Sequence, residues 1–225
     1  MNKYLKVERF FDELIINIKM NILENTYDYK RIKRILKKLI KLNNIKNDDI
    51  FCDFLDNLIT IIEDLRLDLI FFYESDPAAK DLKEIVLAYP GFYAIVVYRI
   101  ANLLTKYNVE YLPKLLSEYA HSKTGIDIHP KAEIGKYFFI DHGTGVVIGE
   151  TTNIGHHVKL YHNVTLGALS LKEGQKLKGL KRHPTVGNYV TIYAGACILG
   201  GNTIIDSNVV ISSNAFITTS VHDKN

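Results

Sequence analysis

The sequence contains few cysteines and little net charge. Cys52 and Cys197 are its only cysteines, and they lack the paired spacing of a disulfide framework or a cysteine zinc site. A reducing compartment is therefore expected. The formal net charge of +3 over 225 residues is too small to indicate a nucleic-acid partner, because lysines alternate with acidic residues.

Long uninterrupted apolar runs are also missing. Charged residues occur throughout the N-terminal segment, which is not typical of a secretory signal. The most apolar stretches are interrupted by Asp64, Arg66, Asp68 or Arg99, which argues against a membrane span. The composition, 47% hydrophobic and 24% charged, is ordinary for a globular protein. We therefore expect a cytoplasmic protein with neither a membrane nor a nucleic-acid partner.

The N-terminal half has the apolar period of helices. Apolar residues recur at helical spacing in 29–40, 55–65 and 94–104. Asp76 followed by Pro77 predicts a helix start, with the aspartate as the cap and proline in the first turn. Tyr89-Pro90-Gly91 predicts a break before the next helix. Residues 1–120 are therefore expected to form an α-helical domain.

The period changes to six after residue 125, with a slip of two residues between Gly145 and Ile148. The positions in phase are Ile128, Ile134, Ile140, Val146, Ile148, Ile154, Leu160, Leu166, Val186, Ile192, Ile198, Ile204, Val210 and Phe216. Neither a helix nor a strand has this period, but a coil of three flat faces does. A β-sandwich with irregular strands explains it less well. The fold class is α+β: the helical domain, then a left-handed parallel β-helix over 121–225 with an extended loop at 168–185.

Asp127 and His142 are candidates for catalysis. They lie fifteen residues apart, close to the length of one coil of about eighteen residues, so neighbouring coils would bring carboxylate and imidazole within reach. Such a pair works as an orienting group and a general base. No serine or cysteine stands beside them in a nucleophile motif. The nucleophile is then expected on the substrate, with direct transfer.

Arg182-His183-Pro184 closes the extended loop. The guanidinium of Arg182 could clamp a carboxylate, and His183 could hold a hydroxyl or stabilise a developing charge. A solvated surface turn explains the same triplet equally well.

A zinc site is the alternative use of the histidines. His142, His157 and His162 could bind zinc across a trimer interface, as in the γ-class carbonic anhydrases, which share this fold. That reading leaves Asp76, Asp127 and the Arg-His-Pro turn without roles. Stacked surface histidines are the simpler explanation.

The motifs together resemble those of the serine acetyltransferase family of hexapeptide-repeat acyltransferases. The resemblance rests on Asp76-Pro77-Ala78, Tyr89-Pro90-Gly91-Phe92, Asp127-Ile128-His129-Pro130, Asp141-His142-Gly143-Thr144-Gly145, Gly149-Glu150-Thr151, Val164-Thr165-Leu166-Gly167 and Arg182-His183-Pro184. It implies acetyl transfer from the cosubstrate acetyl-CoA to the hydroxyl of L-serine, without a metal. The product would be O-acetyl-L-serine, formed in the first step of cysteine biosynthesis.

The resemblance also implies roles for single residues. His142 would be the base and Asp127 its partner. Asp76 and Asp141 would hold the ammonium group of the substrate and Arg182 its carboxylate. His183 would act at the hydroxyl and the oxyanion. Backbone near Gly167, Ala168 and Ala194 would lie beside the pantetheine arm.

The family further implies a homotrimer with active sites at subunit boundaries, and the helical domain would pair two trimers into a hexamer. L-Cysteine would inhibit at the serine site. The chain departs from the family at Ala168, where a second glycine is usual, at His162, where a glutamine is common, and in its longer 169–181 loop. It stops at Asn225, before the final coil and tail. Binding to O-acetylserine sulfhydrylase is therefore expected only if a tail follows Asn225.

Two other readings remain. A related hexapeptide acyltransferase could act on a sugar or homoserine hydroxyl and would retain His142, but a sugar has no use for Asp76 together with Arg182. An inactive scaffold is supported only by the missing tail.

Overall fold

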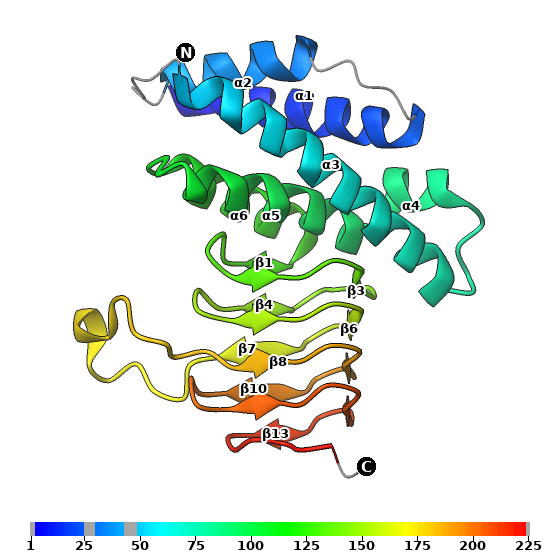
Figure 1. Ribbon diagram of the computed structural model, residues 1–225, viewed down its shortest axis with the longest axis vertical. Helices are drawn as coiled ribbons and strands as arrows, with labels where there is room; N and C mark the ends of the chain where they lie inside the picture. The colour runs from blue at the N-terminus through cyan, green and yellow to red at the C-terminus, as the bar shows by residue number, and fades with distance from the viewer. Residues whose placement is uncertain (1–2, 25–29, 43–48, 224–225) are drawn as a thin grey trace.

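The computed structural model describes residues 3–24, 30–42 and 49–223. Figure 1 shows helices gathered at one end and a column of stacked coils below them, from which one long loop projects. The helices are α1 (Lys3–Glu24), α2 (Lys30–Leu42), α3 (Asp49–Ser75), α4 (Leu82–Ala88), α5 (Pro90–Lys106) and α6 (Leu112–Thr124). The expected helical domain followed by a β-helix is confirmed.

The strands are short, with two or three residues each. They are β1 (Asp127–Ile128), β2 (Glu133–Ile134), β3 (Phe138–Ile140), β4 (Val147–Ile148), β5 (Asn153–Ile154), β6 (Val158–Leu160), β7 (Thr165–Gly167), β8 (Thr185–Val186), β9 (Thr191–Ile192), β10 (Cys197–Leu199), β11 (Ile204–Ile205), β12 (Val210–Ile211) and β13 (Phe216–Ile217). The 3₁₀-helix η1 (Gly174–Leu177) lies in the projecting loop.

Three parallel sheets form the faces of the β-helix. One has the order β1-β4-β7-β10-β13, and the others have the orders β11-β8-β5-β2 and β12-β9-β6-β3. Each coil contributes one strand to each sheet, so residues of successive coils stack. One inward column consists of Ile128, Ile148, Leu166, Ile198 and Ile217. This stacking buries a continuous aliphatic core, as the period of six predicts.

The predicted phase is wrong after residue 200. Ile204, Val210 and Phe216 face outward and are exposed, whereas Ile205 and Ile211 are buried. The cause is one additional residue at the Gly200–Gly201 corner: Ile205 follows Ile198 by seven positions instead of six. A corner accommodates an added residue without disturbing the ladders on either side.

The predicted helix start at Asp76 is also wrong. Helix α3 continues to Ser75 because its apolar positions continue to Phe72, and Asp76 follows its last residue. The next helix, α4, is capped by Asp81, whose side chain accepts a hydrogen bond from the Glu84 N–H. The predicted break at Tyr89-Pro90-Gly91 is confirmed, since α4 ends at Ala88 and α5 begins at Pro90.

The apolarity of the helices was compared with that of membrane spans. No single helix of the described residues is both long and apolar enough to cross a membrane. Only α4 and α5 taken together, bent by 73° at their junction, pass on length and composition.

A buried ion pair joins the helices to the first coil. Arg99 of α5 donates to both carboxylate oxygens of Asp68 of α3, at 2.6 and 2.9 Å. Asp68 also accepts from the Phe138 N–H, and Arg99 donates to the Gly135 carbonyl. Close by, Gly91 permits direct backbone contact, because a Cβ there would lie 2.2 Å from the Ile140 carbonyl oxygen. These contacts set where α3 ends relative to β3.

Substituting Arg99→Met tests this junction. The variant leaves the Asp68 carboxylate buried without its cation, which costs about 3 to 5 kcal/mol when a buried pair is broken from one side. Denaturant unfolding followed by circular dichroism measures the loss. Lys106→Met is the control, because its pair with Glu133 is exposed and 3.9 Å long, and less than about 1 kcal/mol is expected there. Equal losses in the two variants would contradict the role of the junction.

Candidate active site

His142 lies at the corner through which the chain enters β4. This base corner (residues 141–146) turns sharply, with His142 at φ 55° and Gly143 and Gly145 at φ 85° and 78°. The two glycines are required both by these angles and by space, since a Cβ on Gly145 would lie 2.1 Å from Asn163 Oδ1 in the coil below. The turn presents the His142 side chain to solvent, 73% exposed, with its Nε2 3.7 Å from Asp141 Oδ2.

Asp127 lies one coil above the base corner. It stands in β1 and pairs in register with Val147 of β4, so it and His142 occupy neighbouring coils as expected. Within the described residues, however, no hydrogen bond or ion pair joins them, and the ion pair of His142 is with Asp141. The cause is the added length of this corner: Ile148 follows Ile128 by twenty residues, and the turn directs His142 outward.

The negative charges of Asp76 and Asp141 both act on two tyrosines, Tyr89 and Tyr161. The Tyr89 hydroxyl donates to Asp76 Oδ2 at 2.6 Å. This hydrogen bond, together with burial and the nearby charges of Asp76 and Asp141, raises the pKa of Tyr89 to about 12. Burial and, to a lesser extent, the charges of Tyr193, Asp141 and Asp76 raise the pKa of Tyr161. The structure therefore brings together the two carboxylates that the resemblance assigns to an ammonium group.

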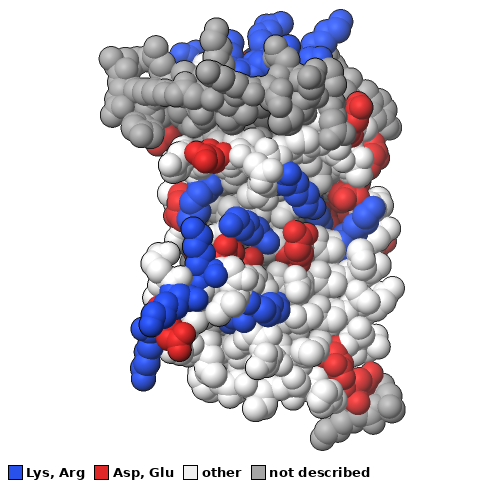
Figure 2. Space-filling view, turned by 60° about the vertical axis from the view of Figure 1, so that its left-hand side comes forward, with Lys and Arg blue, Asp and Glu red and all other residues white. Residues whose placement is uncertain are grey.

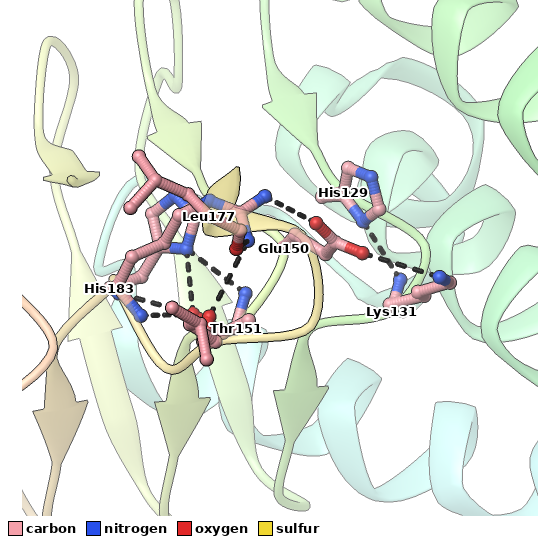
Figure 3. Close-up of polar contacts among 8 residues, drawn as sticks. His129, Lys131, Glu150, Thr151, Leu177 and His183 are labelled. Atoms are coloured by element: carbon pink, nitrogen blue, oxygen red, sulfur yellow. Dashed lines mark hydrogen bonds and ion pairs between the residues drawn. The ribbon is translucent and has the colours of Figure 1, made fainter. Parts of the chain in front are cut away.

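Arg182 and His183 lie on the other side of β4. Here the chain leaves the strand at residues 149–152, and the end of the projecting loop, residues 181–184, packs against it; together they form the arginine corner. The Thr151 hydroxyl accepts hydrogen bonds from the backbone N–H groups of Arg182 and His183, at 2.9 and 3.1 Å. Figure 3 shows Thr151 and His183 facing each other across this corner.

The tautomer of His183 follows from its contacts. Its Nδ1 accepts the Thr151 backbone N–H at 3.0 Å, so Nε2 carries the proton of the neutral ring. The side chain is only 8% exposed. Burial, reinforced by the charge of Arg182, lowers the pKa of His183 to about 4. At neutral pH this residue is therefore an uncharged hydrogen-bond donor.

Glu150 is a member of the arginine corner that sequence reasoning assigned no role. Its carboxylate forms a short ion pair with Arg182 and a second one, 3.2 Å long, with Lys131. Arg182 hydrogen bonds lower the pKa of Glu150 against the opposing effect of burial. The Gly149-Glu150-Thr151 motif was the available signal: Thr151 holds His183 and Glu150 holds Arg182 (Figure 3).

A cavity adjoins the arginine corner. It has a volume of about 730 Å³ and lies between the α5–α6 turn, the first coils and the loop. Its charged side chains and its one histidine are Glu110, Lys114, His129, Lys131, Glu150 and Lys178. Figure 2 shows basic side chains in a band on this side of the molecule, interrupted by acidic ones, reaching the projecting loop.

The candidate residues thus form two groups, which lie at opposite ends of the strands of the five-stranded sheet. The base corner precedes β4 and the arginine corner follows it. The predicted cofactor residues divide in the same way: Gly167 and Ala168 end β7 on the arginine side, and Ala194 precedes β10 on the base side. The two corners are thus separated by β4, and the cavity beside the arginine corner has neither His142 nor Asp141 in its lining.

The three histidines of the zinc reading are not gathered in this chain. The rings of His142 and His162 lie 5.7 Å apart. His157 occupies a different corner, stacked between Tyr137 and Tyr189 at 4.2 and 4.6 Å. Among the described residues, the one group of three such side chains whose ligand atoms all lie within 4.8 Å of one another is Glu118, His121 and Asp127, and Lys114 already pairs with Glu118 at 2.5 Å.

A helical domain on a hexapeptide β-helix, with a histidine, paired carboxylates and an arginine at its corners, defines a hexapeptide-repeat acyltransferase. Comparison with known proteins narrows the class. The family described as serine acetyltransferase, N-terminal, matches residues 18–96. A serine acetyltransferase from Helicobacter pylori is 50% identical over 137 residues, 61% of this chain and 77% of that protein. A plasmid serine acetyltransferase from Synechococcus elongatus is 51% identical over 131 residues, 57% of this chain and 41% of that protein.

Solved structures agree. Native serine acetyltransferase 1 from Entamoeba histolytica is 36% identical, with a TM-score of 0.79, over 96% of this chain and 97% of that one. Isoform 3 from the same organism, in complex with cysteine, is 38% identical with a TM-score of 0.78, over 92% and 78%. A serine acetyltransferase in complex with CoA is 26% identical with a TM-score of 0.68, over 97% and 94%. The chain belongs to the serine acetyltransferase family.

The protonation of His183 can be followed directly. Because burial disfavours its charged form, we expect its imidazole to stay neutral, protonated on Nε2, down to about pH 5. In the unfolded state the ring binds its second proton, on Nδ1, near pH 6.5. His183 therefore destabilises the fold as the pH falls from 6.5 towards 4. Imidazole nitrogen shifts of protein labelled with ¹⁵N-histidine measure the titration, and His183→Gln identifies the resonance. A midpoint near 6.5 would contradict the assignment.

Proposed function

We propose that this chain is a serine O-acetyltransferase that moves the acetyl group of acetyl-CoA to the hydroxyl of L-serine in the cytoplasm. The observation that carries the proposal is the distribution of charge. Two carboxylates, Asp76 and Asp141, gather at one corner and a guanidinium, Arg182, at the other. A zwitterionic amino acid needs this combination, whereas a sugar hydroxyl needs neither group. The product, O-acetyl-L-serine, supplies cysteine biosynthesis.

His142 is the general base of the proposed reaction. It takes the proton of the serine hydroxyl while the oxygen attacks the thioester carbonyl carbon. When the C–S bond breaks, the thiolate of CoA recovers that proton from the imidazolium. Asp127 acts as the orienting partner, and the contact between the two closes when the site is filled, as often happens when apo geometry is loose. Acetyl-CoA lies along the coils beside Gly167, Ala168 and Ala194.

His183 stabilises the oxyanion as a donor. A neutral imidazole with its proton on Nε2 donates a hydrogen bond to the oxygen of the tetrahedral intermediate without giving up a proton. The depressed pKa supports this role, because a ring with a pKa of about 4 keeps the same form throughout the neutral range.

Assembly completes the site. The base corner and the arginine corner lie at opposite ends of the strands of one sheet. A second copy must therefore bring its arginine corner to the first copy's base corner. A homotrimer, whose three boundaries are equivalent, does this for every chain. The exposed outward side chains of Val147 and Phe216 on that sheet supply apolar surface. The helical domains then join two trimers into a hexamer.

L-Cysteine is the proposed feedback inhibitor. It carries the same ammonium and carboxylate groups as serine and competes for Asp76, Asp141 and Arg182. Support comes from the Entamoeba histolytica relative, which was solved in complex with cysteine.

The test is release of CoA from acetyl-CoA with L-serine, compared with homoserine and a galactoside as acceptors. Serine-dependent release is expected, and His142→Ala should lower it by about 10² or more, the usual contribution of a general base. His222→Ala, an exposed histidine paired with Asp206, is the matched control and should retain activity. Release without dependence on serine would sink the function, and full activity of His142→Ala would sink the mechanism alone.

Gly149→Ala tests the position of His183. The added Cβ would lie 2.0 Å from His183 Cδ2, so the ring must move. A displacement of this kind costs about 10² in kcat, while the fold remains. Leu171→Ala in the projecting loop is the control, because the Leu171 residue is 67% exposed. Unchanged kinetics of Gly149→Ala would show that His183 does not contact the reacting atoms.

A further inference from the structure

Asp76 stands where a carboxylate is electrostatically unfavourable. It follows the last residue of α3, and its backbone N–H donates to the Phe72 carbonyl at 3.0 Å. The C-terminal end of a helix carries partial negative charge and repels anions. A carboxylate here rotates into solvent unless donors hold it in place.

Two donors hold Asp76. The Ala78 backbone N–H donates to Oδ1 at 2.8 Å, and the Tyr89 hydroxyl donates to Oδ2 at 2.6 Å. The second is a short charge-assisted hydrogen bond, of the stronger kind. Each oxygen therefore accepts one bond from the protein and retains capacity for a further donor. Tyr89 is the member of this pair that a side-chain substitution can remove.

Tyr89 is itself held firmly. It lies at the junction of α4 and α5, where its N–H donates to the Ile85 carbonyl and its own carbonyl accepts from Tyr93, both at 3.1 Å. Pro90 follows as the first residue of α5. The aromatic ring of Tyr89 meets that of Phe72 edge to face, with 6.4 Å between the ring centroids, and Phe72 in turn contacts Phe139 of β3. The hydroxyl is thus anchored relative to the strand that leads into Asp141.

The Tyr89 hydroxyl also remains a donor. Its hydrogen bond to Asp76 is the main reason for a pKa of about 12, followed by burial and the charges of Asp76, Glu84 and Asp141. It is therefore protonated throughout the neutral range. The charge of Asp141, the second candidate ammonium ligand, therefore also acts on this phenol.

We propose that Tyr89 is a positioning residue, whose hydroxyl holds the Asp76 carboxylate in the orientation that, with Asp141, receives the ammonium group of L-serine. This inference rests on the proposed function, in which Asp76 binds that ammonium group. Tyr89 touches neither acetyl-CoA nor the reacting atoms, so its loss weakens serine binding and leaves the chemical step intact.

The test is Tyr89→Phe, assayed with both substrates varied. Loss of the charge-assisted hydrogen bond from Tyr89 to the Asp76 carboxylate should raise KM for L-serine about tenfold. KM for acetyl-CoA and kcat should change by less than about threefold, because the base and the thioester are untouched. Calorimetric titration with L-serine should show the same tenfold loss of affinity.

Two further variants separate positioning from packing. Tyr93→Phe is the matched control: it removes a tyrosine hydroxyl from the next turn of α5 that has no hydrogen-bond partner within the described part of the chain. Its KM for serine should equal that of the wild type. In an Asp76→Asn background, Tyr89→Phe should add less than about twofold, because the carboxylate that it positions is gone.

The outcomes are distinguishable. An active wild type with unchanged KM for serine in Tyr89→Phe overturns the inference and leaves the proposed function standing. Equal losses for both substrates, accompanied by a lower melting temperature, assign Tyr89 to packing and also overturn it. A wild type that neither binds L-serine nor releases CoA with it overturns the proposed function, and the inference with it.

Discussion

The stacking of coil upon coil is the constraint on which the other features depend. Parallel ladders align Ile128, Ile148, Leu166, Ile198 and Ile217 in one inward column, and burial of these columns excludes water from the whole interior. The faces are therefore rigid and chemically plain, and variation is confined to the corners. Both candidate groups lie there, in turns whose angles and close contacts only glycine accommodates at Gly143 and Gly145. A site built this way inherits its geometry from the stack.

The helical domain contributes to the site through its attachment to the first coil. Asp68 and Arg99 neutralise each other inside the junction and also bind backbone groups of that coil. Their pairing gives the end of α3 a defined place near β3, which leads into Asp141. Asp76 is thereby fixed from the helical side and Asp141 from the β-helix, so the ammonium group of the proposed substrate would be recognised across two kinds of structure. An isolated β-helix would lack half of this recognition.

Sequence alone predicts the repeating parts of the structure well and the irregular parts poorly. A period of six has one economical solution, the three-faced coil, and the helical spacing before it predicted the helical domain; both predictions are confirmed. The inward phase was lost at Gly200, because a corner accepts an added residue without a signature in composition. The helix start at Asp76 failed because aspartate before proline also suits a turn after a helix. Asp127 and His142 were placed on neighbouring coils, but a longer corner turned the imidazole outward. Glu150 meets its partner Arg182 only because the projecting loop folds back onto β4, and no local sequence pattern encodes that fold.

The partition of the site gives the single chain a defined resting state. Arg182 lies beside a buried histidine and forms an ion pair with Glu150. The Glu150 carboxylate also pairs with Lys131. Burial and the charge of Arg182 lower the pKa of His183 and outweigh the opposing charge of Glu150, so the ring stays neutral. At the other corner, the Tyr89 hydroxyl, a neutral donor, holds one of the two carboxylates, Asp76. The arginine corner therefore offers a cation that already pairs with Glu150, and the other corner offers two carboxylates. In the proposed assembly, one amino acid would bridge the corners of two copies, so substrate recognition and assembly would follow from the same charge distribution.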